Sequence, residues 1–404
     1  MTTPSPATRC PFPHQARNEQ KTNPHPLHAG PAVVRDAQGT YHVYGFEAAR
    51  TVLRSEHTKQ AGFNAEAIGD VPTLNNDPVL FAEGEQHHEM RRQTARYFTP
   101  TAVSGYRRMM ERLADDLVDE LVRTGTMNLD DLSLRMAVQV AARVVGLTDS
   151  ALPGMASRIA GFVENDYAAP EHASSLVVRL KTLENQRRVL AFYLLDVRPA
   201  IARRRKQPRE DLISHLLSRN YSDLEIVTEC LTYGTAGMAT TREFISAAAW
   251  HLLEQPELRL EYLHANERER HAILLEILRL EPVVGELYRR TTAELEVNGQ
   301  VIPQGSRVAL HIYDANADRS TVGEAPLAVC PQRSLPRGVQ GQVMSFGDGH
   351  HRCPGAFLAI QESDIFLRRL LTLRGLRVVR PPRVSWNDLI KGYELRGFGL
   401  EVVR

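Results

Sequence analysis

The feature that most constrains the fold of this chain is one long helical segment near its middle. Ser222 and Glu225 have the spacing of a capping box, and Gln255-Pro256 interrupts the pattern, so we predict a helix of about 32 residues. The stretch "LTYGTAGMATTREFISAAAWHLL" is apolar on several sides of that helix. Such a helix must cross the core of a large domain, because a surface helix needs a polar face.

The segments around this helix are mostly helical as well. Most of the chain from Gln86 to about Leu278 repeats apolar residues with the 3.6-residue period, for example "YRRMMERLADDLVDELV". Two strand-rich stretches flank them: "AVVRDAQGTYHVYG", a predicted hairpin, and "ELEVNGQVIPQGSRVALHIY" after Pro282. We expect the late strands to pair with the early hairpin. The predicted fold class is mainly α with small β-sheets.

The chain is predicted to form a single large domain preceded by an arm. Residues 1–30 are rich in proline and poor in apolar residues, which favours an extended or disordered N-terminal arm. No linker, low-complexity block or internal repeat interrupts residues 31–404. We therefore expect one domain over that range, although it is longer than the usual domain of about 100 to 200 residues.

Charge and composition exclude several classes of partner. With 49 basic and 48 acidic side chains, the net charge of +1 creates no global field for nucleic acid or an anionic membrane. No segment has the length of a signal peptide or of a membrane span, which needs about 18 or more apolar residues. The four widely spaced cysteines suit a reducing compartment. We expect a cytoplasmic monomer without a nucleic-acid or membrane partner.

The stretch "SFGDGHHRCPGAFLAIQ" places a single cysteine, Cys353, between a glycine-rich turn and an apolar helical run. A thiolate is a strong metal ligand, and its pKa falls at the start of a helix. Pro354 suits a first helical turn, so backbone N–H groups of residues 355 and 356 could point at the sulfur. Cys353 therefore predicts a metal-ligand site with room for one large partner.

The residues around Cys353 fit a flat ligand. Gly347 and Gly349 allow the preceding turn to bend tightly, and Gly355 allows a planar group to approach the backbone. Phe346 would shield the site from water. Two alternatives stay open from the residues alone: a buried structural cysteine, and a zinc site. Zinc would use Cys330, His350, His351 and Cys353, but adjacent histidines are poor simultaneous ligands and the spacing matches no usual finger.

This loop resembles the cysteine-ligand loop of the cytochrome P-450 family, the heme-thiolate monooxygenases. The family pattern is F-G-x-G-x-H-x-C-x-G, and "FGDGHHRCPG" matches each fixed position. The matching residues are Phe346, Gly347, Gly349, His351, Cys353 and Gly355. The resemblance implies the family fold, with heme b (iron protoporphyrin IX) between the long central helix and this loop. It also implies that Cys353 is the axial ligand of the heme iron.

The stretch "EILRLEP" contains a second motif. Glu276 and Arg279 lie three residues apart on one helix face, a pair that also occurs on many surface helices. In the resembled family an E-x-x-R pair packs beneath the heme and is joined by a downstream arginine. The resemblance implies that Arg333 of "CPQR" is this structural third member.

The middle of the long helix contains the third motif, "AGMATT". Ala236-Gly237 and the hydroxyls of Thr240 and Thr241 could mark a close helix crossing with back-bonded threonines. The motif also resembles the family's oxygen-activation segment, A/G-G-x-D/E-T-T/S. That resemblance implies that Ala236 and Gly237 line the heme and that Gly237, Thr240 and Thr241 serve catalysis.

One position departs from this third motif, because Ala239 stands where the family has a carboxylate. The usual acidic proton relay is then missing. Glu243 lies one turn further on but is expected to point away from the iron. We expect water ordered by Thr240, or a polar group of the substrate, to deliver protons.

The fourth motif is cationic. His87 and Arg91 in "EQHHEMRRQTARYFTP" are four residues apart, so both can reach one anion; a solvated polar helix is the alternative. The resemblance assigns this pair, together with Arg289 and His351, to the two heme propionates.

The sequence thus predicts a soluble bacterial-type heme-thiolate monooxygenase that uses O2 and acts on a small apolar organic substrate. Electrons must come from outside, so the expected partners are a ferredoxin and its reductase with NAD(P)H as the ultimate donor. Docking would use exposed arginines such as Arg92, Arg96 and Arg352. The alternatives are a peroxide-driven or radical-coupling heme-thiolate enzyme, and a non-catalytic heme or zinc module acting as a sensor or carrier.

The sequence does not identify the substrate. Its pocket walls are expected from five places: residues 61–84, the helices between about 155 and 200, Tyr233 with Ala236, residues 283–287, and the turn near Leu395.

Overall fold

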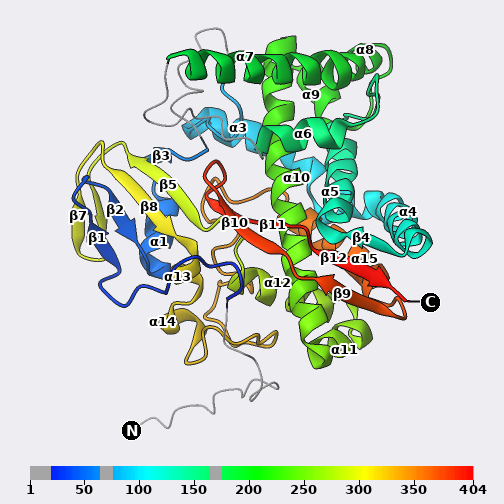
Figure 1. Ribbon diagram of the computed structural model, residues 1–404. Coiled ribbons are helices and arrows are strands. Elements are labelled where there is room, and N and C mark those ends of the chain that lie inside the picture. The colour runs from blue at the N-terminus through cyan, green and yellow to red at the C-terminus, as the bar shows by residue number, and fades with distance from the viewer. Residues whose placement is uncertain (1–19, 64–75, 164–174, 404) are drawn as a thin grey trace. The chain divides into compact units, whose positions relative to one another are not determined.

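The structure of the protein is a computed structural model that describes residues 20–63, 76–163 and 175–403 (Figure 1). The chain divides into two compact units. Unit 1 combines the chain up to Lys59 with Ala247–Cys353, and unit 2 combines Gln60–Ser246 with the chain from Pro354 onward. Each unit is described by itself below.

A five-stranded sheet forms one side of unit 1, in the order β1-β2-β8-β5-β3. Its strands are β1 (Val33–Arg35), β2 (Tyr41–Val43), β3 (Thr58–Gln60), β5 (Glu286–Thr291) and β8 (Arg307–His311). The early hairpin β1-β2 joins the late strands through β2, which runs parallel to β8 with Tyr41 opposite Val308. This pairing of early and late strands was expected from the sequence.

A hydrophobic core holds this sheet to its neighbours. Helix α1 (Phe46–Arg54) buries Phe46, Val52 and Leu53 against Val43 and Leu310 of the sheet. The small hairpin of β6 (Leu295–Val297) and β7 (Gln300–Ile302) turns at Asn298-Gly299, both with positive φ. Asn-Gly suits such a turn, because both central residues must adopt a left-handed conformation.

The rest of unit 1 is helical. It contains α11 (Pro256–His264), α12 (Glu267–Leu280), α13 (Ile312–Asn316) and α14 (Arg319–Val322). Asn266 caps α12 in a reciprocal capping box with Glu269.

Residues 20–31 contain no helix or strand, yet they are tied to unit 1. The buried carboxylate of Glu281 accepts hydrogen bonds from the N–H of Lys21 at 2.7 Å and from the hydroxyl of Thr22 at 2.5 Å. His251 lies 2.8 Å from the same carboxylate, and Tyr313 lies 2.6 Å from the Thr22 hydroxyl. This polar cluster anchors the described part of the arm.

Unit 2 is mainly helical. Its described helices are α3 (Gly84–Thr94), η1 (Ala95–Tyr97), α4 (Pro100–Thr124), α5 (Leu129–Val145), α6 (Met155–Val163), α7 (Ser175–Phe192), the π-helix η2 (Tyr193–Val197), α8 (Arg198–Lys206), α9 (Leu212–Ser218) and α15 (Ala356–Leu371). Helix α15 packs along α4. Two small sheets complete the unit, one of β4 (Thr126–Asn128), β12 (Gly399–Val402) and β9 (Leu376–Arg380), the other of β10 (Arg383–Asn387) and β11 (Gly392–Arg396).

The long helix predicted from the sequence is α10 (Asp223–Glu254), with 32 residues. The Ser222 hydroxyl accepts from the Glu225 N–H at 3.3 Å, and the Glu225 carboxylate accepts from the Ser222 N–H at 2.7 Å. Both predicted ends are therefore confirmed. Among the described residues, no helix combines the length and apolar character that a membrane crossing requires.

Candidate active site

The loop before Cys353 is a chain of tight turns in unit 1. Gly347 and Gly349 both have a φ of +67°, a conformation that side chains other than glycine rarely adopt. A Cβ atom at Gly349 would lie 2.2 Å from the carbonyl oxygen of Leu53, so no larger residue fits there. The N–H of Cys353 donates to the carbonyl of Phe346 at 2.8 Å, which closes the loop. Cys353 is half-buried.

Helix α1 holds one side of this loop. The guanidinium of Arg54 donates to Asp348 at 3.0 Å, and Arg50 lies 3.5 Å from the same carboxylate. Because Asp348 stands between the two glycines, these contacts help to fix their unusual backbone conformation. The helix after the loop, α15, begins at Ala356 with Gly355 as its N-cap, so Pro354 precedes the helix instead of occupying its first turn.

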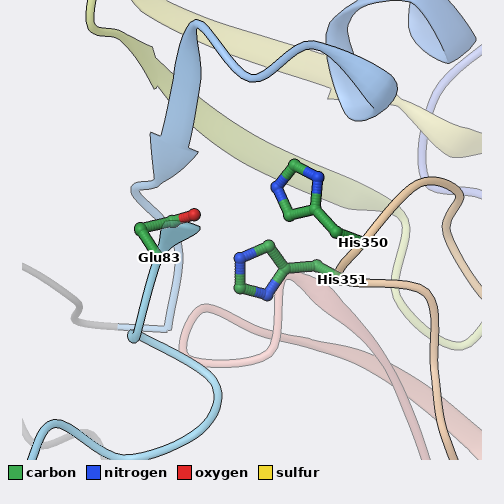
Figure 2. Close-up of side chains that lie close together, drawn as sticks. All are labelled: Glu83, His350 and His351. Carbon is green, nitrogen blue, oxygen red and sulfur yellow. The ribbon is translucent and has the colours of Figure 1, made fainter. Parts of the chain in front are cut away.

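The two histidines of the loop lie side by side. The ring centroids of His350 and His351 are 4.9 Å apart and the rings are tilted by 58° (Figure 2). Glu83, also drawn in Figure 2, belongs to unit 2, where its carboxylate accepts from the Gln60 N–H at 2.6 Å. Among the described residues, no cluster of three or more metal-ligating side chains contains Cys330 or Cys353. The four-residue zinc site considered from the sequence therefore does not form.

Glu276, Arg279 and Arg333 meet in one buried ion-pair network of unit 1. Arg279 on α12 donates to both carboxylate oxygens of Glu276 at 2.8 Å, and Arg333 donates to one of them at 3.0 Å. The backbone N–H of Cys330 donates to that same oxygen at 3.0 Å. Glu276 is 3% exposed and Arg279 is fully buried, so this is not a surface pair.

Asn316 connects that network to the cysteine loop, and sequence reasoning did not single it out. Its side-chain oxygen accepts from the N–H of Met344 at 2.7 Å, and its amide nitrogen donates to the carbonyl of Arg279 at 2.9 Å and to Ser345 at 2.8 Å. Arg279 in turn donates to the carbonyl of Asn316 at 2.9 Å. The start of the cysteine loop is thus hydrogen-bonded to the end of α12.

The four cations expected at the propionates lie in both units. In unit 1, Arg289 is buried on β5 and donates to the carbonyl of Tyr288 at 2.9 Å, and His351 lies in the cysteine loop. In unit 2, His87 and Arg91 stand one turn apart on α3, with His87 buried. Arginine and histidine N–H donors of this kind suit the carboxylates of a ligand.

The motif on α10 presents its residues in different directions. The hydroxyl of Thr240 donates to the carbonyl of Ala236 at 2.6 Å, and Ala236 itself is exposed. A Cβ atom at Gly237 would lie 3.6 Å from the Cβ of Ala141 on α5, an ordinary contact distance, so the two helices lie close together at this glycine. Both features of the structural alternative, the helix crossing and the back-bonded threonine, are present. Ala236 and Thr240 remain on the open face of the helix.

Ala239 is buried in a small apolar cluster of unit 2. It contacts Ile390, with Phe63 and Leu389 packed around the pair. No polar group of this cluster replaces the carboxylate that the resembled motif has at this position. Glu243 does not replace it either, because its carboxylate accepts from Arg396 at 2.6 Å and from the N–H of Leu395 at 2.7 Å. Burial raises the pKa of Glu243 to about 7 against the opposing effect of Arg396 and Arg242.

Thr241 faces α15 through a residue that sequence reasoning missed. Its hydroxyl is hydrogen-bonded to the carboxyl group of Glu362, and both side chains are 3% exposed. Burial raises the pKa of Glu362 well above its usual value, which favours its protonated form. The only signal in the sequence was an acidic residue within the apolar run after Cys353, which indicates burial without naming a partner.

The expected pocket walls are only partly described. Residues 64–75 of the first loop, and 164–174 of the helical region, lie outside the described residues. Tyr233 stacks on Phe98 with ring centroids 5.9 Å apart, and Leu395 is fully buried.

Comparisons with known proteins settle the family. The family model described as Cytochrome P450 matches residues 270–379, which include the Glu276 network and the cysteine loop. The chain is 24% identical over 345 residues to the biotin biosynthesis cytochrome P450 of Bacillus subtilis, covering 82% of each chain. The chain belongs to the cytochrome P450 family.

Other relatives of this cytochrome P450 are oxygenases. It is 27% identical to the nocardicin C N-oxygenase of Nocardia uniformis over 90% of this chain and 92% of that one. It is also 27% identical to the mycinamicin IV hydroxylase/epoxidase of Micromonospora griseorubida, over 81% and 79% of the two chains. The protein is a heme-dependent oxidoreductase of the monooxygenase class, and the sensor and peroxide-driven alternatives are not favoured.

Solved structures agree with the fold. P450BioI in complex with an acyl carrier protein covers 94% of this chain and 96% of its own at a TM-score of 0.73 and 22% identity. CalO2 covers 92% and 93% at a TM-score of 0.76 and 23% identity. The cytochrome P450 fold predicted from the sequence is confirmed. Membership in this family implies heme iron as the cofactor, and O2 and redox partners for the reaction.

Proposed function

We propose that the sulfur of Cys353 is the axial ligand of a heme b iron and that the enzyme inserts oxygen into a small apolar organic substrate. The observation that carries this proposal is the loop from Phe346 to Cys353, whose two positive-φ glycines and internal hydrogen bond hold the cysteine half-exposed. When bound, heme with a thiolate ligand activates dioxygen for insertion into a C–H bond. The protein's own residues orient the heme and the substrate and handle protons.

Four cationic side chains bind the two propionates in this proposal: His87, Arg91, Arg289 and His351. Charge-assisted hydrogen bonds to carboxylates are about twice as strong as neutral ones, so this set would fix the orientation of the heme. Phe346, Gly355 and Ala236 would line its faces, whereas Gly237, expected there from the sequence, faces α5. The network of Glu276, Arg279 and Arg333 serves structure, because it fixes the cysteine loop through Asn316.

In this proposal Thr240 delivers protons. Its hydroxyl hydrogen is used by the Ala236 carbonyl, so its oxygen is available to accept a hydrogen bond from a water molecule or a substrate group. Thr241 acts as a positioning residue, since its hydroxyl is held by Glu362. We assign the catalytic role in the "AGMATT" motif to Thr240.

The remaining parts of the proposal follow the family. The protein acts in the cytoplasm as a monomer, with residues 31–404 as the cytochrome P450 domain and residues 1–30 as its arm. A ferredoxin and its reductase deliver electrons from NAD(P)H. Arg92 and Arg96 are exposed, as docking to an acidic ferredoxin requires.

The ferrous carbon monoxide spectrum tests the ligand. Thiolate ligation red-shifts the Soret band and imidazole ligation does not, so we expect the red-shifted band in the wild type and its loss in Cys353→Ser. The control is Cys330→Ser, which should keep the band, because Cys330 contacts Glu276 through its backbone N–H. A red-shifted band in Cys353→Ser would overturn the assignment. Turnover supported by peroxide without any ferredoxin would contradict the electron route.

A further inference from the structure

A small cavity in unit 2 lies beside α10, away from the "AGMATT" motif along the helix. Helices α3, α9 and α10 and the segment of residues 76–82 enclose it. Its volume of about 10 Å³ is at the lower limit of what one water molecule needs. The polar residues around it are Gln93, Thr94, His215, Tyr221, Glu229 and Tyr233. The rest of the lining is apolar, so a water molecule there would depend on these side chains for the two to four partners that it needs.

Glu229 is the buried acid of this cavity. The residue is 2% exposed, and its Oε1 accepts from the N–H of Val79 at 2.9 Å. Its Oε2 is buried and has no hydrogen-bond partner among the described residues. A buried carboxyl oxygen without a partner is costly, so a water molecule in the cavity would satisfy it. Burial raises the pKa of Glu229 to about 8, so the group is mainly protonated at neutral pH and can donate.

The charged and titratable groups around Glu229 do not reverse this protonation. His215 on α9 is partly buried, and its pKa is lowered by burial and by Arg96 and Arg219. Burial raises the pKa values of Tyr221, Tyr233 and Cys230. The positive charge of Arg91 on α3 acts on Tyr233. His215 is therefore a neutral imidazole that can both accept and donate a proton between solvent and the cavity.

The cavity lies on the same face of α10 as Thr240. At 100° per residue, Glu229, Tyr233, Ala236 and Thr240 fall within about 60° of one another around the helix. Glu229 and Thr240 are about 16 Å apart along the axis. The small residue Ala236 lies between them and is exposed on the same face.

We propose that the carboxyl group of Glu229 and one water molecule in this cavity form a proton-uptake site that feeds Thr240 along α10. The inference rests on the proposed function and deepens it, because it names a proton source in place of the carboxylate that is missing at position 239. Each oxygen insertion consumes two electrons, two protons and one O2 and releases one water. In each transfer Glu229 gives one proton to the cavity water and regains one from solvent through His215, so its carboxyl group is unchanged overall.

The first test is infrared spectroscopy on the heme-loaded protein. Glu229→Gln keeps the size of the side chain and an oxygen that can accept from Val79, but it removes the titratable proton. We expect the wild type to show a carboxylic acid C=O band that shifts in D2O, disappears as the pH rises through about 8, and is absent in Glu229→Gln. Glu362→Gln removes a different acid and should leave this band. If wild type and Glu229→Gln have identical spectra in this region, the proposal is wrong.

The second test is coupling, measured as product and peroxide formed per NAD(P)H with one bound substrate. Glu229→Gln should form less product and more peroxide per NAD(P)H. Coupling in the wild type should change as the pH passes about 8, and Glu229→Gln should lack this change. Tyr233→Phe should show a smaller loss of the same kind. If Glu229→Gln has the same coupling and the same pH profile as the wild type, Glu229 has only a structural role, through its contact with Val79. The infrared band does not depend on thiolate ligation, so failure of the carbon monoxide test would leave it measurable and the two failures can be told apart.

Discussion

Arg279 donates hydrogen bonds from a fully buried position to the Glu276 carboxylate and to the carbonyls of Asn316, Pro326 and Ala328. A lone E-x-x-R pair on a helix surface contributes only about 0.2 to 0.5 kcal/mol. In a buried pair the loss of one partner costs more, because the other charge is left in a low-dielectric interior. The side chain thus contributes to stability and to the position of the cysteine loop at once.

Arg279→Ala should therefore lower the free energy of unfolding by about 3 to 5 kcal/mol. Heme content should fall with it, since Asn316 and Met344 lose their support. Arg268 on the same helix α12 is exposed, and Arg268→Ala should change stability by about 0.5 kcal/mol or less. Chemical denaturation and the absorbance of bound heme measure both effects. Equal stability of the two variants would show that the network of Glu276, Arg279 and Arg333 does not contribute to the free energy of unfolding.

At the scale of the element, α10 distributes its functions around its circumference. Gly237 packs against α5, Ala239 lies in an apolar cluster, Thr241 bonds to α15, and Ala236 and Thr240 remain on the open face. Adjacent residues on a helix point about 100° apart, so neighbouring threonines can serve different purposes.

The two threonines form a matched pair for mutation. Thr240→Val should leave the melting temperature nearly unchanged but lower product formed per NAD(P)H and raise peroxide, because the oxygen that accepts from water is lost. Thr241→Val should lower stability by about 1 to 3 kcal/mol, since the buried Glu362 carboxyl loses its partner. Its coupling should stay close to that of the wild type. The reverse pattern, with coupling lost in Thr241→Val alone, would assign the proton route to Glu362.

At the scale of the whole molecule, burial of acids makes the folded state sensitive to pH. Glu229 has a pKa of about 8 in the folded state against 4.5 as its ordinary value. Below pH 4.5 both states carry the proton. Between about pH 4.5 and 8 only the unfolded state releases it, so the free energy of unfolding falls as the pH rises; above about pH 8 this group adds no further change.

Glu229→Gln should remove this dependence. The free energy of unfolding of the variant should decline less between pH 4.5 and 8, and the two curves should diverge by at most about 5 kcal/mol over that range. Tyr233→Phe keeps the acid and should follow the slope of the wild type. Denaturant unfolding at a series of pH values measures the curves. Parallel curves for wild type and Glu229→Gln would show that the carboxyl group is ionised in the folded protein at neutral pH.

The sequence by itself determined the features that follow from local rules. The capping box of Ser222 and the Gln255-Pro256 stop bounded α10, because helix ends depend on neighbouring residues. Gly347 and Gly349 marked the tight turns before Cys353, because only glycine adopts a positive φ at no steric cost. The same local motif, matched to a known family, identified the class of cofactor.

Only the tertiary structure decided which partners meet across long separations. Asn316 reaches the cysteine loop, Glu362 reaches Thr241, and Glu229 reaches Val79, although each pair lies on separate elements. Helical periodicity indicates which face of an element is buried, but it does not say which residue lies opposite. A buried acid in the sequence is therefore recognisable as an exception to the apolar pattern, while its partner, its pKa and its use depend on how the elements pack.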